Sequence, residues 1–210
     1  KAITTQWASF EGANPEAALA LELPGIRVLH AVRHSSKLRT GHLRANRFSL
    51  RVRDVPEDRD ADVRAIAARI AEVGMPNYFG EQRFGRDGDN VERAILWLSG
   101  RARAPREHFE RKMLASALQS RFFNEVVGAR VAAGELARIF HGDLCRKEDT
   151  GGVFTSEDVV TDQARADRYE ISPTGPMFGP DMRWPTHDAE ARERAVLEAS
   201  GLSPEVLAAL

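Results

Sequence analysis

The 210-residue chain has a single cysteine, Cys145, which excludes an internal disulfide bond and any metal site built from cysteines alone. It has no apolar run close to the ~20 residues that a membrane-spanning helix needs, and no signal-peptide pattern at its start. Neither charge is in excess, since 30 Lys and Arg stand against 31 Asp and Glu. Composition therefore indicates a globular protein without a membrane partner, and the cytoplasm is the expected compartment.

The positive charge is concentrated in one segment. Between Arg33 and Arg53 there are seven basic residues and no acidic residue, whereas positions 54–62 carry five carboxylates. A basic segment in a neutral chain is typical of a local phosphate-binding surface. A solvated strand face with long basic side chains is the alternative, and charge alone does not separate the two.

Two period-two patterns and one apolar run predict strands in the first fifty or so residues. They lie at positions 3–7, 26–32 and 47–53. In the last of these, Phe48 and Leu50 alternate with arginines, so one apolar face toward a core and one basic face are predicted. A sheet with such a basic face can bind an anionic backbone.

After Pro56 the pattern changes to the spacing of amphipathic helices. It predicts helices over three stretches, at 63–73, 91–98 and 109–131. Thr186 is predicted to cap a charged helix that runs to Ser200, and a further helix is predicted to start at Ser203. The connecting segments 142–154 and 172–185 are predicted loops. The change from strands to helices near residue 70 predicts two structural units.

Two patterns could indicate a metal site, and neither is complete. His30 and His34 are four apart, but they lie in predicted strand and loop with no third ligand nearby. Asp87 begins a run that resembles a calcium loop, but its twelfth position is Leu98 where such a loop needs glutamate. No metal site is therefore predicted.

Residues 74–85, GMPNYFGEQRFG, combine three glycines with three aromatic side chains. This composition suits a tight loop in which backbone and rings approach a partner. It equally suits a structural corner whose aromatics anchor two elements to each other. The residues alone leave both interpretations open.

The second part of this segment, NYFGEQRFG, resembles the NYFG-x-QRFG signature of the TruD family of pseudouridine synthases. Four other segments are similar to motifs of that family and occur in the expected order. They are Lys1, Ala2, Thr4 and Gln6, which resemble the stretch after the family's Gly-x-Lys-Asp motif; Lys37, Arg39, Gly41, Asn46 and Phe48; Ser116, Ala117, Ser120, Phe123 and Asn124; and the Gly-Pro-x-x-Gly loop at 175–179.

The resemblance implies an α/β (α+β) fold of two parts. Residues 1–70 would be part of a mixed-sheet pseudouridine synthase catalytic domain, and residues 71–210 a mostly helical TruD-type insertion domain. It also implies the isomerisation of uridine to pseudouridine in tRNA, typically at position 13. That reaction uses no cofactor and no metal, and the expected partner is tRNA.

The resemblance also implies which residues meet the RNA. Asn46 matches the asparagine of the substrate pocket, whose amide can hydrogen-bond a uracil edge or the catalytic carboxylate. Phe48 matches the aromatic residue near the target base, although packing in a core is the alternative for a residue on the apolar face of a strand. Candidate phosphate or structural contacts are Lys37, Arg39, Arg44 and Arg83.

The reaction requires a carboxylate nucleophile at the ribose, and no acidic residue in the first fifty positions lies in a matching motif. The resemblance implies that the nucleophilic aspartate lies two positions before Lys1, so this chain alone is expected to be inactive. A non-catalytic RNA-binding module of the same fold is the alternative hypothesis. A protein-interaction domain without a nucleic-acid role is a third.

Overall fold

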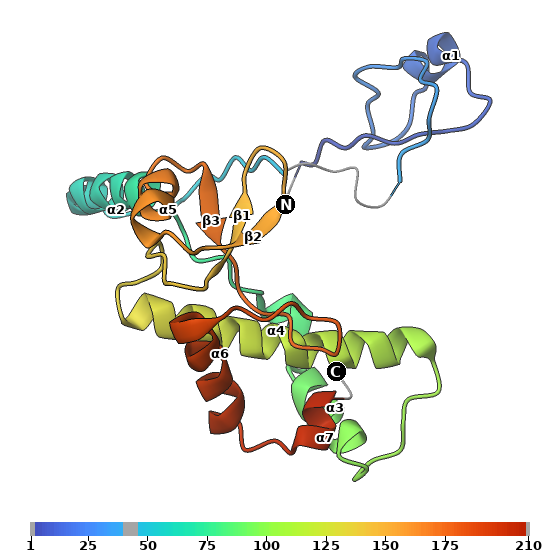
Figure 1. The fold of residues 1–210 in the computed structure, drawn as a ribbon. Coiled ribbons are helices and arrows are strands. Elements are labelled where there is room, and N and C mark those ends of the chain that lie inside the picture. The colour runs from blue at the N-terminus through green and yellow to red at the C-terminus, as the bar shows by residue number, and fades with distance from the viewer. Residues whose placement is uncertain (1–2, 40–45, 209–210) are drawn as a thin grey trace. The chain divides into compact units, whose positions relative to one another are not determined.

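The computed structural model describes residues 3–39 and 46–208, and it divides the chain into two compact units, Lys1–Pro56 and Glu57–Leu210 (Figure 1). The division lies upstream of the boundary predicted near residue 70, because the helix that follows Pro56 groups with the second unit. The assignment of the two parts to a catalytic domain and an insertion domain stays a prediction.

The first unit contains one helix, α1 (Pro15–Leu19), and no strand among its described residues. Asn14 starts the helix, because its side chain accepts a hydrogen bond from the Glu16 N–H at 2.9 Å and proline follows at the first helical position. An isolated bridge between Leu23 and Ile26 is the one ladder contact described there.

The strands predicted at 3–7, 26–32 and 47–53 are therefore wrong for this structure. Alternation is a necessary feature of a half-buried strand, but a strand also needs a hydrogen-bonding neighbour and a surface to cover. The described residues of the first unit supply neither. The apolar side chains of the last segment are accordingly exposed, Phe48 by 78% and Leu50 by 85%.

The second unit contains the remaining helices and a small sheet (Figure 1). In chain order the elements are η1 (Glu57–Arg59), α2 (Asp60–Val73), η2 (Glu81–Phe84), α3 (Asn90–Leu98), α4 (His108–Ala132), β1 (Leu144–Lys147), β2 (Val153–Thr155), α5 (Val159–Ala166), β3 (Ile171–Pro173), α6 (His187–Ala199) and α7 (Pro204–Ala208). All the helices predicted after Pro56 are confirmed. Thr186 precedes α6 as predicted, but its side chain makes no capping hydrogen bond.

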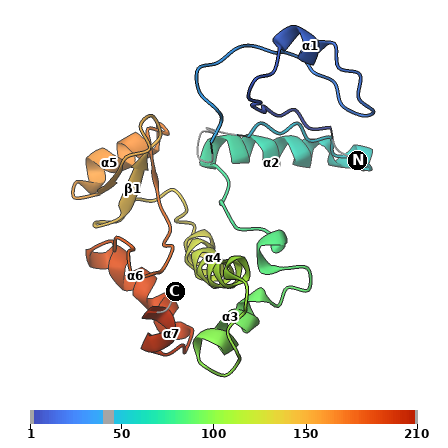
Figure 2. The same cartoon turned by 90° about the vertical axis from the view of Figure 1, so that its right-hand side faces the viewer.

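Helix α4 forms the centre of the larger of the two hydrophobic clusters in the second unit. Figure 2 looks nearly along it and shows α3 and α6 beside it, in agreement with their contacts. Leu114, Leu118 and Phe122, spaced four apart, are buried on the side that faces the core. The ring of Phe122 meets that of Phe178 edge to face, with centroids 5.7 Å apart. Each such side chain contributes roughly 1.5–3 kcal/mol on burial.

The sheet has the order β2-β1-β3 with both pairs antiparallel. The segments 142–154 and 172–185 were predicted as loops, and this is wrong where β1, β2 and β3 occupy them. Strands of three or four residues are too short to show a period. Cys145 on β1 is fully buried, and burial raises the pKa of its thiol to about 12. It therefore stays an unreactive thiol at neutral pH.

Helix α2 has the predicted amphipathic spacing, but its apolar residues are exposed, Ile66 by 60%. Its attachment to the rest of the unit includes the hydroxyl of Tyr169, which donates to the carbonyls of Ala71 (3.3 Å) and Glu72. Among the described helices, none combines the length and the apolar character that a bilayer crossing needs.

Candidate functional site

The residues predicted to meet the target uridine lie in the first unit. Asn46 and Phe48 are both exposed, in a segment without regular structure. The described contacts therefore give no support to the alternative that Phe48 packs in a core. Lys37 and Arg39 are exposed in the same basic segment, whereas Arg44 lies outside the described residues.

Two hydrogen bonds hold the start of the basic segment. The Ser36 N–H donates to Nδ1 of His34 at 3.1 Å, and the Leu38 N–H donates to Oγ of Ser9 at 3.1 Å. The second bond links two segments 29 positions apart in sequence. It ties the start of the basic segment to the first described residues.

The signature at 77–85 is attached to α4 by a two-point amide contact. The N–H of Phe79 donates to Oδ1 of Asn124 at 2.9 Å, and Nδ2 of Asn124 donates back to the Phe79 carbonyl at 2.9 Å. One side-chain amide thus satisfies both backbone groups of a residue, as a neighbouring strand would. The Phe79 ring also meets that of Phe123 edge to face at 5.2 Å.

Arg83 strengthens the same attachment. Its guanidinium lies over the Phe79 ring, 5.0 Å from the centroid, and its Nη1 donates to Oγ of Ser116 at 3.2 Å. A cation above an aromatic face contributes about 0.5–1 kcal/mol at an exposed site. Arg83 is therefore a structural contact in this structure, and its role in RNA binding stays a prediction.

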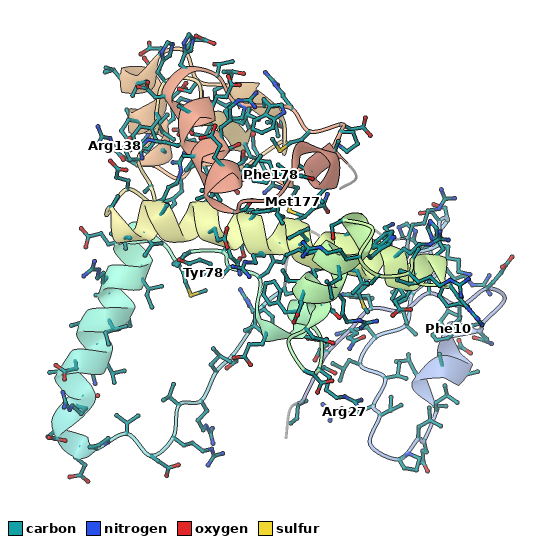
Figure 3. All side chains as sticks on the ribbon, turned by 90° about the horizontal axis from the view of Figure 1, so that it is seen from below. Phe10, Arg27, Tyr78, Arg138, Met177 and Phe178 are labelled. Atoms are coloured by element: carbon teal, nitrogen blue, oxygen red, sulfur yellow. The ribbon has the colours of Figure 1, made fainter. Side chains whose placement is uncertain are left out.

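The loop at 175–179 reaches α4 from another direction. A Cβ at Gly175 would stand 2.5 Å from the Phe123 ring, so only glycine allows this approach. Nε2 of Gln119 donates to the Phe178 carbonyl at 2.7 Å. Figure 3 shows Tyr78 from the signature and Phe178 from this loop along α4. Two motif segments thus pack onto α4, which itself carries a third motif, and this favours the anchoring interpretation of the aromatic-rich segment.

Comparison with known proteins gives the family. The model of the family "tRNA pseudouridine synthase D (TruD)" matches residues 1–96 and 106–209. The chain belongs to the TruD family. The tRNA pseudouridine synthase D of Anaeromyxobacter dehalogenans (strain 2CP-C) is 46% identical over 209 residues, which are 96% of this chain and 59% of that protein. A Thermus thermophilus protein of the same name is 42% identical over 209 residues, 98% of this chain and 57% of that protein.

Comparison with solved structures also identifies the TruD fold. The crystal structure of the putative TruD of Methanosarcina mazei superposes with a TM-score of 0.55 at 20% identity, covering 75% of this chain and 53% of that chain. This confirms the α+β fold class. The chain spans less than two thirds of the length of the curated TruD relatives it matches.

The TruD motifs therefore fall into two groups in this chain. Those of the second unit form the packing around α4. Asn46 and Phe48 of the first unit have their side chains exposed and make no core contact among the described residues. Exposed polar and aromatic groups are available to a ligand, and those buried around α4 are not.

An open hollow of about 580 Å³ lies next to the signature of the second unit. Its lining combines Arg86 and Arg121 with Glu81 and Glu125, and Phe84 forms part of its apolar surface. Two carboxylates offset the two guanidinium groups, so this hollow does not have the charge of a phosphate site.

A buried charged cluster next to α6 carries no signal in the sequence, because its members lie far apart along the chain. Arg130 pairs with Asp143 and also donates to the Arg138 carbonyl at 3.0 Å. Glu193 is buried beside them, and its Oε2 has no hydrogen-bond partner among the described residues. Burial raises the pKa of Glu193 to about 7, although Arg130 opposes the shift, and Asp143 adds to it.

Glu193→Gln is expected to stabilise the chain at pH 8 by roughly 1–2 kcal/mol and to give no gain at pH 5. The folded-state pKa of Glu193 is raised, so its contribution to stability is complete below the unfolded-state pKa and is lost as the pH rises through 7. Urea unfolding at both pH values measures the difference. Glu198→Gln, at an exposed position of the same helix, is the control, and an equal effect of Glu193→Gln at both pH values would contradict the assignment.

Proposed function

We propose that the full-length protein containing this chain is a tRNA pseudouridine synthase that isomerises uridine at position 13 of tRNA. The observation that carries the proposal is the match to the TruD family over nearly the whole chain. Its relatives from Anaeromyxobacter and Thermus bear the name tRNA pseudouridine synthase D. Because the chain spans 57–59% of these relatives, the activity is assigned to the full-length protein.

The chemistry defines what the site must provide. The bond between the ribose C1′ and the uracil N1 breaks, and a bond from C1′ to C5 forms. C5 loses a proton and N1 gains one, so atoms and electrons balance without a redox partner. A carboxylate nucleophile is needed at C1′. In this proposal it is the aspartate that the family resemblance places two positions before Lys1.

Asn46 and Phe48 are assigned to holding the base while it is detached and turned. Taking a nucleotide out of its stack costs a few kcal/mol, and stacking on an aromatic ring returns ~1–3 kcal/mol. The exposed ring of Phe48 is available for this contact, and the Asn46 amide can donate to and accept from the uracil edge. The proposed phosphate contacts are Lys37, Arg39, Arg44 and Arg83.

Mass mapping of an unmodified tRNA transcript after incubation with the full-length protein tests the proposal. Pseudouridine is expected at position 13. A variant with asparagine in place of the upstream aspartate is expected to form none while it retains tRNA affinity. Product formation that survives this replacement contradicts the mechanism. Salt-sensitive tRNA binding without product from the unaltered protein supports the non-catalytic RNA-binding module instead.

A further inference from the structure

Three side chains lie together on the surface of the second unit, although no sequence motif connects them: His141, Glu157 and His187. Their ligand atoms all lie within 4.8 Å of one another. Nε2 of His141 is 3.3 Å from Oε2 of Glu157, and the rings of His141 and His187 are stacked with centroids 4.1 Å apart. None of the three belongs to the packing around α4 or to the proposed uridine site.

Backbone hydrogen bonds hold the three loops together independently of these side chains. The Gly142 N–H donates to the Ser156 carbonyl at 2.8 Å, and the Thr186 N–H donates to the Gly142 carbonyl at 3.0 Å. Each residue of the cluster directly neighbours one of these three residues in the chain. This junction of three backbone segments thus brings two imidazoles and one carboxylate together without a ligand.

Gly142 makes this close junction possible. Its φ is +86°, and a Cβ at this position would stand 2.0 Å from the Thr186 carbonyl oxygen. No residue with a side chain fits there without moving the backbone. The arrangement therefore depends on a fixed crossing of the chain and not on flexible side chains that meet by chance.

We propose that His141, Glu157 and His187 bind a divalent transition-metal ion, for which Zn²⁺ is the best match. Imidazole and carboxylate are ligands that zinc accepts, at about 2.0–2.2 Å. Ligand atoms around a tetrahedral ion at such distances are about 3.4 Å apart. From a spread of 4.8 Å, closure requires shifts on the order of 1 Å and a turn of one imidazole out of the stack.

Three protein ligands leave one position of a tetrahedral zinc ion for water. The ion would add a side-chain link to the backbone junction and so clamp the loop before β1, the end of β2 and the start of α6. This site contradicts the sequence-based expectation of no metal, which rested on patterns of residues close to each other in the chain.

Zinc binding to the chain, freed of metals with a chelator, tests the proposal by calorimetry and by thermal unfolding. One Zn²⁺ per chain is expected, together with a zinc-dependent rise in Tm. His187→Gln and Glu157→Gln are each expected to raise the Kd at least tenfold and to reduce the rise in Tm. Both side chains are exposed, so the metal-free Tm of these variants is expected to match that of the unaltered chain.

The double variant His30→Gln/His34→Gln is the matched control, because it removes an exposed histidine pair outside the cluster. Its zinc affinity is expected to be unchanged. An excess of Mg²⁺ is expected not to compete, since Mg²⁺ prefers an octahedral set of oxygen ligands. Absence of stoichiometric zinc binding, equal affinity in His187→Gln, or loss of affinity in the double variant would each overturn the proposal.

Discussion

Asn124→Ala is expected to lower the free energy of unfolding by about 3 kcal/mol. The amide of Asn124 satisfies both the N–H and the carbonyl of Phe79 at 2.9 Å, so alanine removes two hydrogen bonds and leaves two backbone groups in a partly buried place. Each lost bond costs about 0.5–1.5 kcal/mol, and each group left without a partner adds to that cost. Urea unfolding measures the change.

Asn77→Ala is the control for this prediction. Asn77 lies in the same signature, is exposed, and makes no side-chain hydrogen bond that the described part of the chain records. Its replacement is expected to change stability by less than ~0.5 kcal/mol. Equal effects of the two substitutions would mean that the attachment to α4 does not stabilise the second unit.

The helices of the second unit could be predicted because they are long enough for their period to be visible. Leu114, Leu118 and Phe122 repeat every four positions within a 25-residue helix, and the structure buries all three. The three strands span only three or four residues each, so neither pattern nor length distinguishes them from loops.

In the first unit, by contrast, the sequence predicted strands where the described residues form none. Phe48 and Leu50 alternate with arginines as in a half-buried strand, yet both are exposed and no ladder partner lies among the described residues of that unit. Alternation describes one chain segment, whereas a strand depends on a neighbouring segment that the pattern does not identify.

The candidate sites were predictable to different degrees. Asn46 and Phe48 were predicted only from the family resemblance, because a polar residue and an aromatic residue two positions apart form no recognisable motif. The signature at 77–85 and the motif on α4 were visible separately, but the contact of Phe79 with Asn124 joins positions 45 apart. The cluster of His141, Glu157 and His187 cannot be found without the fold, since its members come from three segments far apart in the sequence.

Phe48→Ala in the full-length protein is expected to lower kcat/KM for pseudouridine formation about 10- to 100-fold, the loss of ~1–3 kcal/mol of base stacking. Because Phe48 is exposed, Tm is expected to stay unchanged, which separates loss of a substrate contact from loss of structure. Leu50→Ala is the matched control, as it removes a similarly exposed apolar side chain two positions away.

The central claim is that Asn46 and Phe48 receive a uridine taken out of folded tRNA. The rate of pseudouridine formation in a single turnover, measured for the unaltered protein, Phe48→Ala and Leu50→Ala, tests it most directly. A slow Phe48→Ala reaction beside an unaltered Leu50→Ala reaction is predicted. Equal rates for all three proteins would contradict the claim.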